Sequence, residues 1–91
     1  MPRVPSDAAA HVGRQIVEIR RRLALTQDDL ASASGIDSSN IRAFENGRAM
    51  PSIHTLIRLA VALNVQPAEL LAGLTPELFA DADNDGRRRS A

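Results

Sequence analysis

The chain has 91 residues, of which 44% are hydrophobic, so it is long enough for one small domain with a compact core. It contains no cysteine, which excludes disulfide bonds and thiolate metal sites and fits a reducing cytosol. Its eleven arginines, without any lysine, balance eleven acidic residues, so net charge by itself does not indicate a nucleic-acid partner. The sequence lacks a membrane span and a signal-peptide core, so we expect a cytoplasmic protein with no membrane partner.

The N-terminal part predicts a flexible arm followed by a first helix. Two prolines near the start favour an arm over residues 1–10, although Ser6 and Asp7 could cap an earlier helix start. Residues 8–25 have the apolar spacing of an amphipathic helix. Its predicted buried stripe contains Val12, Ile16, Ile19 and Leu23. Gly13 lowers the helix propensity of this segment and would allow a close approach of another helix or of a DNA backbone.

The stretch from Thr26 to Gly47 predicts two short helices joined by a tight turn. Thr26 has the hydroxyl of an N-cap, and Asp29 stands three residues later, as in a capping box. Gly35 fits the left-handed position that ends a helix, and Asp37 is the predicted N-cap of the next helix, residues 38–46. A turn this short is typical of the helix-turn-helix motif.

The periodicity of the second of these helices separates a buried face from an outer face. Ile41 and Phe44 share the predicted inner face. The outer face presents hydroxyls, an amide, a guanidinium and a methyl group, from Ser38, Ser39, Arg42, Ala43 and Asn46. Such side chains can bind phosphates or base edges in a DNA major groove.

The remaining chain predicts two further helices and a short C-terminal helical segment. Ser52 caps a helix ending at Leu63, with a predicted inner side of Ile53, Leu56, Leu59, Ala60 and Leu63, and Asn64 takes the left-handed position after it. Pro67 opens a fifth helix that buries Leu70 and Leu71, and Thr75 to Glu77 start a further turn. Residues 80–91 are read as a disordered tail with acidic and basic runs, so the predicted domain covers residues 11–79.

The residues needed for catalysis or for binding a metal ion are scarce. The chain has two histidines, His11 and His54, and neither cysteine, tyrosine nor a glycine-rich phosphate loop. Ser52 is already used as a helix cap, and no carboxylate is placed behind His54. We therefore expect no enzyme activity, no metal site and no cofactor.

The ordered motifs from Val12 to Leu71 resemble the Cro and phage-repressor type helix-turn-helix proteins, also called the XRE family. The resemblance is carried by Arg20, Gln27, Leu30, Ala31, Gly35, Ile41, Glu45, Asn46, Gly47, Pro51, Leu56, Leu63 and Leu70. It implies an all-α, compact five-helix bundle that binds double-stranded DNA. It also implies a structural ion pair between Arg20 and Glu45, and phosphate contacts from Gln27, Asn46 and Arg48.

The sequence thus predicts a sequence-specific DNA-binding transcriptional regulator, a repressor or controller protein that binds a near-palindromic operator as a homodimer. Its dimer interface is expected in the C-terminal segment, with Leu70, Leu74, Leu78 and Phe79. RNA polymerase and a toxin are further candidate partners of such a small protein. The alternative is a helical protein-interaction module or antitoxin whose main partner is another protein, which the neutral net charge keeps open.

Overall fold

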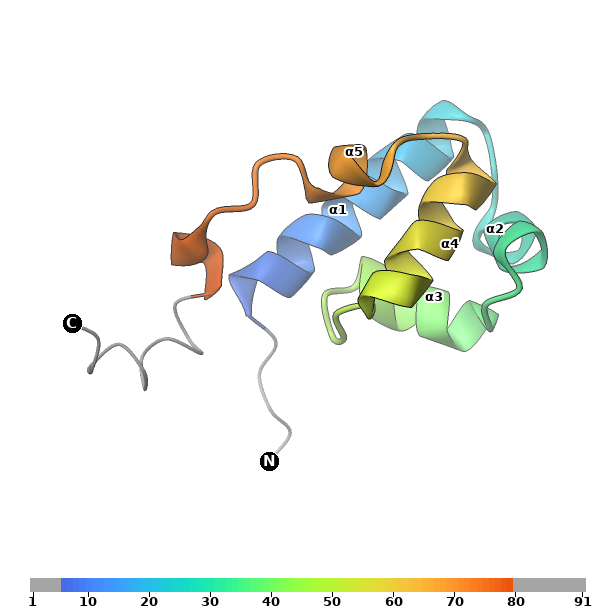
Figure 1. Ribbon diagram of the computed structural model, residues 1–91. Coiled ribbons are helices and arrows are strands. Elements are labelled where there is room, and N and C mark those ends of the chain that lie inside the picture. Colours follow the sequence, from blue (N-terminus) through green and yellow to red (C-terminus); the bar gives the residue numbers. More distant parts are fainter. Residues whose placement is uncertain (1–5, 80–91) are drawn as a thin grey trace.

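The computed structural model describes residues 6–79, and all regular secondary structure in this part of the chain is helical (Figure 1). The elements are α1 (Asp7–Arg22), α2 (Gln27–Ser34), α3 (Ser38–Glu45), α4 (Ile53–Leu63), α5 (Pro67–Leu71) and the short 3-10 helix η1 (Pro76–Phe79). This confirms the predicted all-α bundle with an added C-terminal helical turn. The predicted tail, residues 80–91, and the first half of the predicted arm lie outside the described residues.

Helix α1 begins earlier than the predicted domain boundary. The hydroxyl of Ser6 accepts a hydrogen bond from the backbone N–H of Ala9 at 3.2 Å, so Ser6 is the N-cap. Residues 7–10 are therefore helical, and their assignment to a flexible arm was wrong. Ala8 and Ala9 are buried, which ties this first turn to the domain.

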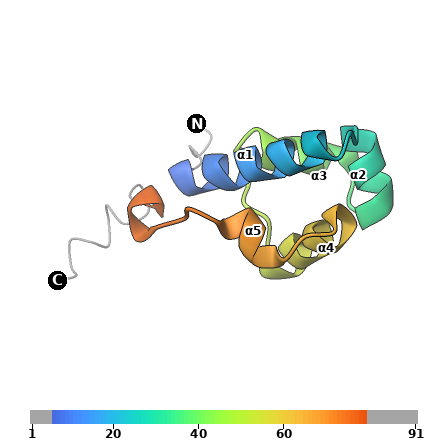
Figure 2. The same cartoon turned by 90° about the horizontal axis from the view of Figure 1, so that it is seen from above.

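The helices enclose one core (Figures 1 and 2). Helix α1 contacts α3, α5 and η1, whereas α2 contacts α3 and α4, and α4 also contacts α5. The core consists of apolar side chains from all five α-helices and from the turn before α3: Val12, Ile16, Ile19, Leu30, Ile36, Ile41, Leu56, Leu59, Ala60, Leu63 and Leu70. None of the helices in residues 6–79 has the length and apolar run needed to span a bilayer.

Three residues predicted to be buried are exposed. Leu23 is the C-cap residue after α1, Ile53 is the first residue of α4, and Leu71 is the last residue of α5. Leu23 and Leu71 lie at C-terminal helix ends, where the chain changes direction and the apolar repeat of the helix no longer points the side chain at the core. Ile53 lies on the same exposed face of α4 as Ile57 and Val61. The prediction extended the apolar repeat too far at Leu23 and Leu71, and made the inner face of α4 too wide at Ile53.

Ala24 is expected to be replaceable by glycine with a gain in stability. This residue has a φ of 58° in the link between α1 and α2, a left-handed conformation in which a Cβ atom is unfavourable. We expect Ala24→Gly to raise the free energy of unfolding by about 0.5–1 kcal/mol, measured by thermal or urea unfolding. As the control, Ala33→Gly, at an exposed position of α2, should lower the free energy of unfolding by about 1 kcal/mol. Equal losses for both variants would contradict the prediction.

Candidate nucleic-acid interface

The first helix of the central pair begins with a complete capping box. The backbone N–H of Asp29 donates to the Thr26 hydroxyl and the backbone N–H of Thr26 donates to the Asp29 carboxylate, both at 2.9 Å. The hydrogen bond from the Thr26 backbone lowers the pKa of Asp29, because it favours the charged carboxylate. The predicted start of α2 is confirmed in detail.

The turn between α2 and α3 is held from α4. Gly35 has a φ of 74°, and its N–H donates to the carbonyl of Ala31 at 2.9 Å. A guanidinium nitrogen of Arg58 donates to the carbonyl oxygens of Ser34 at 2.9 Å and Gly35 at 3.0 Å. The positive φ favours glycine here, and a Cβ atom on Gly35 would lie 2.6 Å from this nitrogen, so a larger residue would displace the end of the Arg58 side chain.

Sequence reasoning missed the role of Arg58. The residue lies more than twenty positions beyond the turn that it contacts, and no local motif links the two. A cation at the C-terminal end of α2 is favourable because the last carbonyl groups of a helix carry partial negative charge. Arg58 therefore ties the C-terminal end of α2, where the turn begins, to α4.

Helix α3 presents a polar outer face. Ser39, Arg42 and Asn46 are exposed as predicted, whereas Ser38 and Ala43 are half-buried and Ile41 is fully buried. Asn40, which the prediction omitted, is also exposed. Arg48 follows in the exposed loop after α3.

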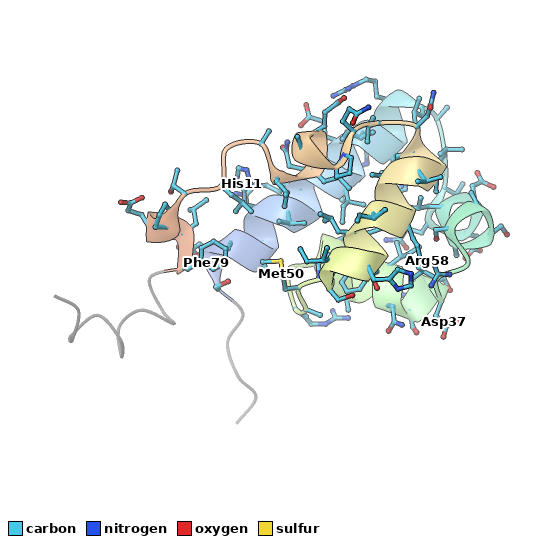
Figure 3. All side chains as sticks on the ribbon, viewed as in Figure 1. His11, Asp37, Met50, Arg58 and Phe79 are labelled. Carbon is cyan, nitrogen blue, oxygen red and sulfur yellow. The ribbon has the colours of Figure 1, made fainter. Side chains whose placement is uncertain are left out.

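Asp37 occupies the N-cap position of α3, but its side chain accepts no capping hydrogen bond. The predicted role of its carboxylate as a cap was therefore wrong. The first turn of α3 is closed through the backbone, because the carbonyl of Asp37 accepts hydrogen bonds from Asn40 and Ile41. Figure 3 shows Asp37 at the N-terminal end of α3, below Arg58 of α4.

The C-terminal end of α3 is held by the predicted ion pair. Arg20 Nε donates to Glu45 Oε2 at 2.7 Å and a second guanidinium nitrogen donates to Oε1 at 2.9 Å, so the pair is bidentate. Only 11% of the Arg20 side chain and 4% of the Glu45 side chain are exposed. The hydrogen bond to Glu45 raises the pKa of Arg20.

Two further contacts extend this pair to the start of α2. Arg20 also donates to the carbonyl of Leu25 at 2.9 Å, and the Gln27 amide donates to Glu45 Oε1 at 2.8 Å. Glu45 thus accepts hydrogen bonds from both α1 and α2. Gln27 has this structural contact, and its predicted phosphate contact stays a prediction.

Gly13 allows α1 to cross close to the end of α3. A Cβ atom at this position would overlap the carbonyl oxygen of Phe44 and lie 2.8 Å from that of Glu45. Of the two close approaches predicted for this glycine, the structure therefore has the one to another helix.

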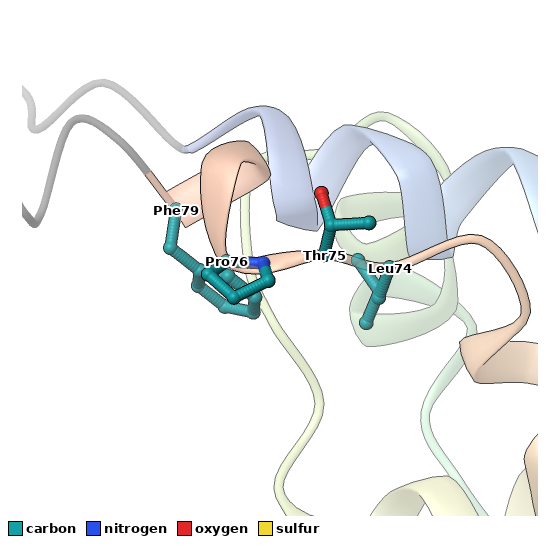
Figure 4. Close-up of a pocket in the computed structure, with 4 residues that line it drawn as sticks. All are labelled: Leu74, Thr75, Pro76 and Phe79. Carbon is teal, nitrogen blue, oxygen red and sulfur yellow. The ribbon is translucent and has the colours of Figure 1, made fainter.

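The predicted C-terminal interface residues differ in their accessibility. Leu70 is fully buried in the core, so its assignment to a dimer interface was wrong. Leu74 and Leu78 are half-buried, and η1 packs on α1. Phe79 remains partly exposed beside an open hollow that it lines with Leu74, Thr75 and Pro76 (Figure 4).

Helix α4 also has exposed apolar side chains. Ile53, Ile57 and Val61 are spaced four residues apart and are 71%, 44% and 74% exposed. Residues at this spacing lie on one face of a helix, so the three form a continuous stripe, called the α4 stripe below.

Comparisons with known proteins agree with this geometry. A family model described as helix-turn-helix matches residues 16–70. The chain is 37% identical over 65 residues to an uncharacterized HTH-type transcriptional regulator, y4dJ, of Sinorhizobium fredii, covering 71% of this chain and 84% of that protein. It is 35% identical over 54 residues to the ImmF control region 10 kDa protein of Bacillus phage phi105, covering 59% of this chain and 60% of that protein.

A solved structure has the same helical arrangement. The restriction-modification controller protein C.AhdI from Aeromonas hydrophila is 34% identical, with a TM-score of 0.67. The match covers 68% of this chain and 94% of that chain.

Proposed function

Since the chain belongs to the helix-turn-helix family of DNA-binding transcriptional regulators, we propose that it recognises a specific operator by inserting α3 into the major groove. The observation that carries the proposal is the combination of a fixed α2–Gly35–α3 turn with an exposed polar face on α3. In this motif the second helix lies in the major groove and its N-terminal residues contact base edges. Gln27, Asn46 and Arg48 are proposed to contact phosphates and to set the register on DNA.

The neutral net charge is compatible with this function because several acids lie at helix starts rather than on the outer face of α3. Asp28, Asp29, Glu69 and Glu77 all lie in the first turn of a helix. A salt titration of binding to random duplex DNA separates a DNA-binding protein from a protein-interaction module. Counterion release gives a DNA-binding protein a steep salt dependence, and a protein without DNA affinity has none.

Arg42 is expected to read a base rather than a phosphate. We expect Arg42→Ala to weaken binding to an operator selected from random duplex DNA by about 1–3 kcal/mol and to relax the preference at one base pair. Arg14→Ala, which removes an exposed arginine from α1, is the matched control and should leave that preference unchanged. A uniform loss on all sequences, with a smaller salt slope, would assign Arg42 to phosphate binding instead.

We also propose that the regulator is a homodimer. A two-fold dimer places two α3 helices on one face, with half-sites about one helical turn, roughly 34–36 Å, apart, and therefore requires a near-palindromic operator. The α4 stripe is a better candidate for the dimer interface than the predicted C-terminal segment. Its side chains are exposed, whereas Leu74 and Leu78 are already partly covered by packing within the protein. A two-fold axis beside α4 would bring each apolar stripe against its copy.

A charge placed in the stripe is expected to dissociate the dimer. We expect Ile57→Glu to convert a dimer to a monomer at tens of micromolar in sedimentation experiments, because a carboxylate at an apolar contact is desolvated without a partner. Phe79→Glu is the matched test of the C-terminal alternative, and should leave the dimer intact. The opposite result would move the interface to the C-terminal segment, and a monomeric wild-type protein would rule out the dimer.

A further inference from the structure

We infer that Asp37 is a specificity-determining residue, which selects a cytosine, through its exocyclic amino group, at one position of each half-site. The inference rests on the proposed function, because it requires α3 to enter the major groove. It adds a carboxylate to the outer face of α3, which was expected to contact bases through hydroxyl, amide, guanidinium and methyl groups.

The first observation is that the Asp37 carboxylate has no partner among the residues that the structure describes. Its side chain is exposed, caps no N–H of α3, and makes neither a hydrogen bond nor a salt bridge with any side chain in residues 6–79. Arg58, which holds the adjoining turn, donates from its guanidinium to the carbonyl oxygens of Ser34 and Gly35. The folded domain therefore does not use this carboxylate, although aspartate commonly caps a helix at such a position.

The second observation is the position of Asp37 on the proposed reading surface. It directly precedes Ser38, the first residue of α3, and the N-terminal end of the recognition helix is the part that reaches base edges in this motif. It also lines an open hollow at the turn with Asp28, Ser32 and Ser38. In Figure 3 its side chain lies at the N-terminal end of α3, away from α1.

A carboxylate at this place is costly on most DNA sequences. Phosphate groups repel it, and the base edges facing it carry acceptors at guanine N7 and O6, adenine N7 and thymine O4. Binding removes water from the carboxylate, so it must receive a hydrogen bond to avoid an unfavourable desolvation. Only amino groups, those of cytosine and adenine, donate hydrogen bonds in the major groove.

Cytosine fits a carboxylate better than adenine does. The adenine amino group lies beside the N7 acceptor, which repels a second carboxylate oxygen, whereas the cytosine amino group has no acceptor next to it on the same base. An amide, in contrast, matches the donor and acceptor pair of adenine. The identity of residue 37 therefore predicts the preferred base.

The test compares DNA sequences selected from a random duplex library by the wild-type protein, Asp37→Ala and Asp37→Asn. We expect the wild-type motif to contain a cytosine that the alanine variant no longer requires, and the asparagine variant to shift that position towards adenine. When this cytosine is replaced in the DNA motif, the affinity of the wild-type protein should fall by roughly 5- to 100-fold. The affinity of Asp37→Ala for the same altered DNA should be almost unchanged. On random duplex DNA, Asp37→Ala should bind more tightly than wild type, because one repulsive charge is removed.

Asp28→Asn is the matched control. It removes an acid from the same hollow but lies on α2, so it should strengthen non-specific binding without changing the selected motif. If the Asp37 variants selected the wild-type motif unaltered, or behaved as Asp28→Asn does, the inference would be overturned while the proposed function stood. If the wild-type protein selected no motif at all, the proposed function and this inference would both fail. Thermal melts of the variants confirm that each is folded.

Discussion

Glu45→Gln is expected to destabilise the domain by about 3–5 kcal/mol, because it leaves the nearly buried guanidinium of Arg20 without its counter-charge. Glu45 accepts three hydrogen bonds, two from Arg20 and one from Gln27, and these join α1 and α2 to the end of α3. A loss of this size is a large share of the about 5–15 kcal/mol that stabilises a typical domain. Urea unfolding of the variant measures it directly.

A double-mutant cycle separates the ion pair from other effects of the substitutions. Arg20→Met alone should also be strongly destabilising, while Arg20→Met with Glu45→Gln should lose much less than the sum of the two, because neither charge is then stranded. Glu18→Gln is the control for the same chemical change at an exposed pair. Glu18 and Arg22 are 4.0 Å apart and exposed, so about 0.5 kcal/mol or less is expected there. Small and additive effects at Arg20 and Glu45 would contradict this account.

The ion pair is expected to act on DNA binding through the position of α3. Weakening it frees the C-terminal end of the helix, while Arg58 continues to hold the turn at the N-terminal end. If Glu45→Gln lowers the affinity for the operator, conditions that stabilise the fold should recover part of this loss. A lower temperature, at which more of the variant is folded, is one such condition. Loss of a direct base contact would not be recovered in this way.

Local features of the sequence predicted those parts of the fold that depend on neighbouring residues. The capping box of Thr26 and Asp29, the left-handed Gly35 and the left-handed Asn64 each involve only a few consecutive positions. The Arg20–Glu45 pair spans 25 residues and was predicted through the family resemblance alone. Arg58 had neither kind of signal, and its contact with the turn was missed.

The wrong predictions concern the burial of apolar residues and one helix cap. Hydrophobic periodicity identifies a helix face but does not show where the helix ends or what covers it, so Leu23, Ile53 and Leu71 were assigned to the core. Periodicity also predicted that Leu70 is buried, which is confirmed, because α5 packs on α1 and α4. The additional assignment of Leu70 to the C-terminal interface was wrong for the same reason. Asp37 was read as a cap because aspartate favours that position, and only the geometry shows that its carboxylate is not used.

Gly13→Ala is expected to destabilise the protein although alanine is the better helix former. In an open helix this change would add about 1 kcal/mol of stability. Here the new methyl group would meet the carbonyl oxygens of Phe44 and Glu45, which are backbone atoms at the end of α3 and cannot rotate away. Overpacking of this kind costs about 1–3 kcal/mol or more, so urea unfolding should show a net loss.

The neighbouring position gives the control for helix propensity. Arg14 is exposed on α1, so Arg14→Ala should be more stable than Arg14→Gly by about 1 kcal/mol, the reverse of the order expected at position 13. Since the clash is with α3, Gly13→Ala should also weaken operator binding at a temperature where the variant is fully folded. If alanine instead stabilised the domain at both positions, α1 and α3 would have room to separate, and the close crossing would not be what fixes the position of α3.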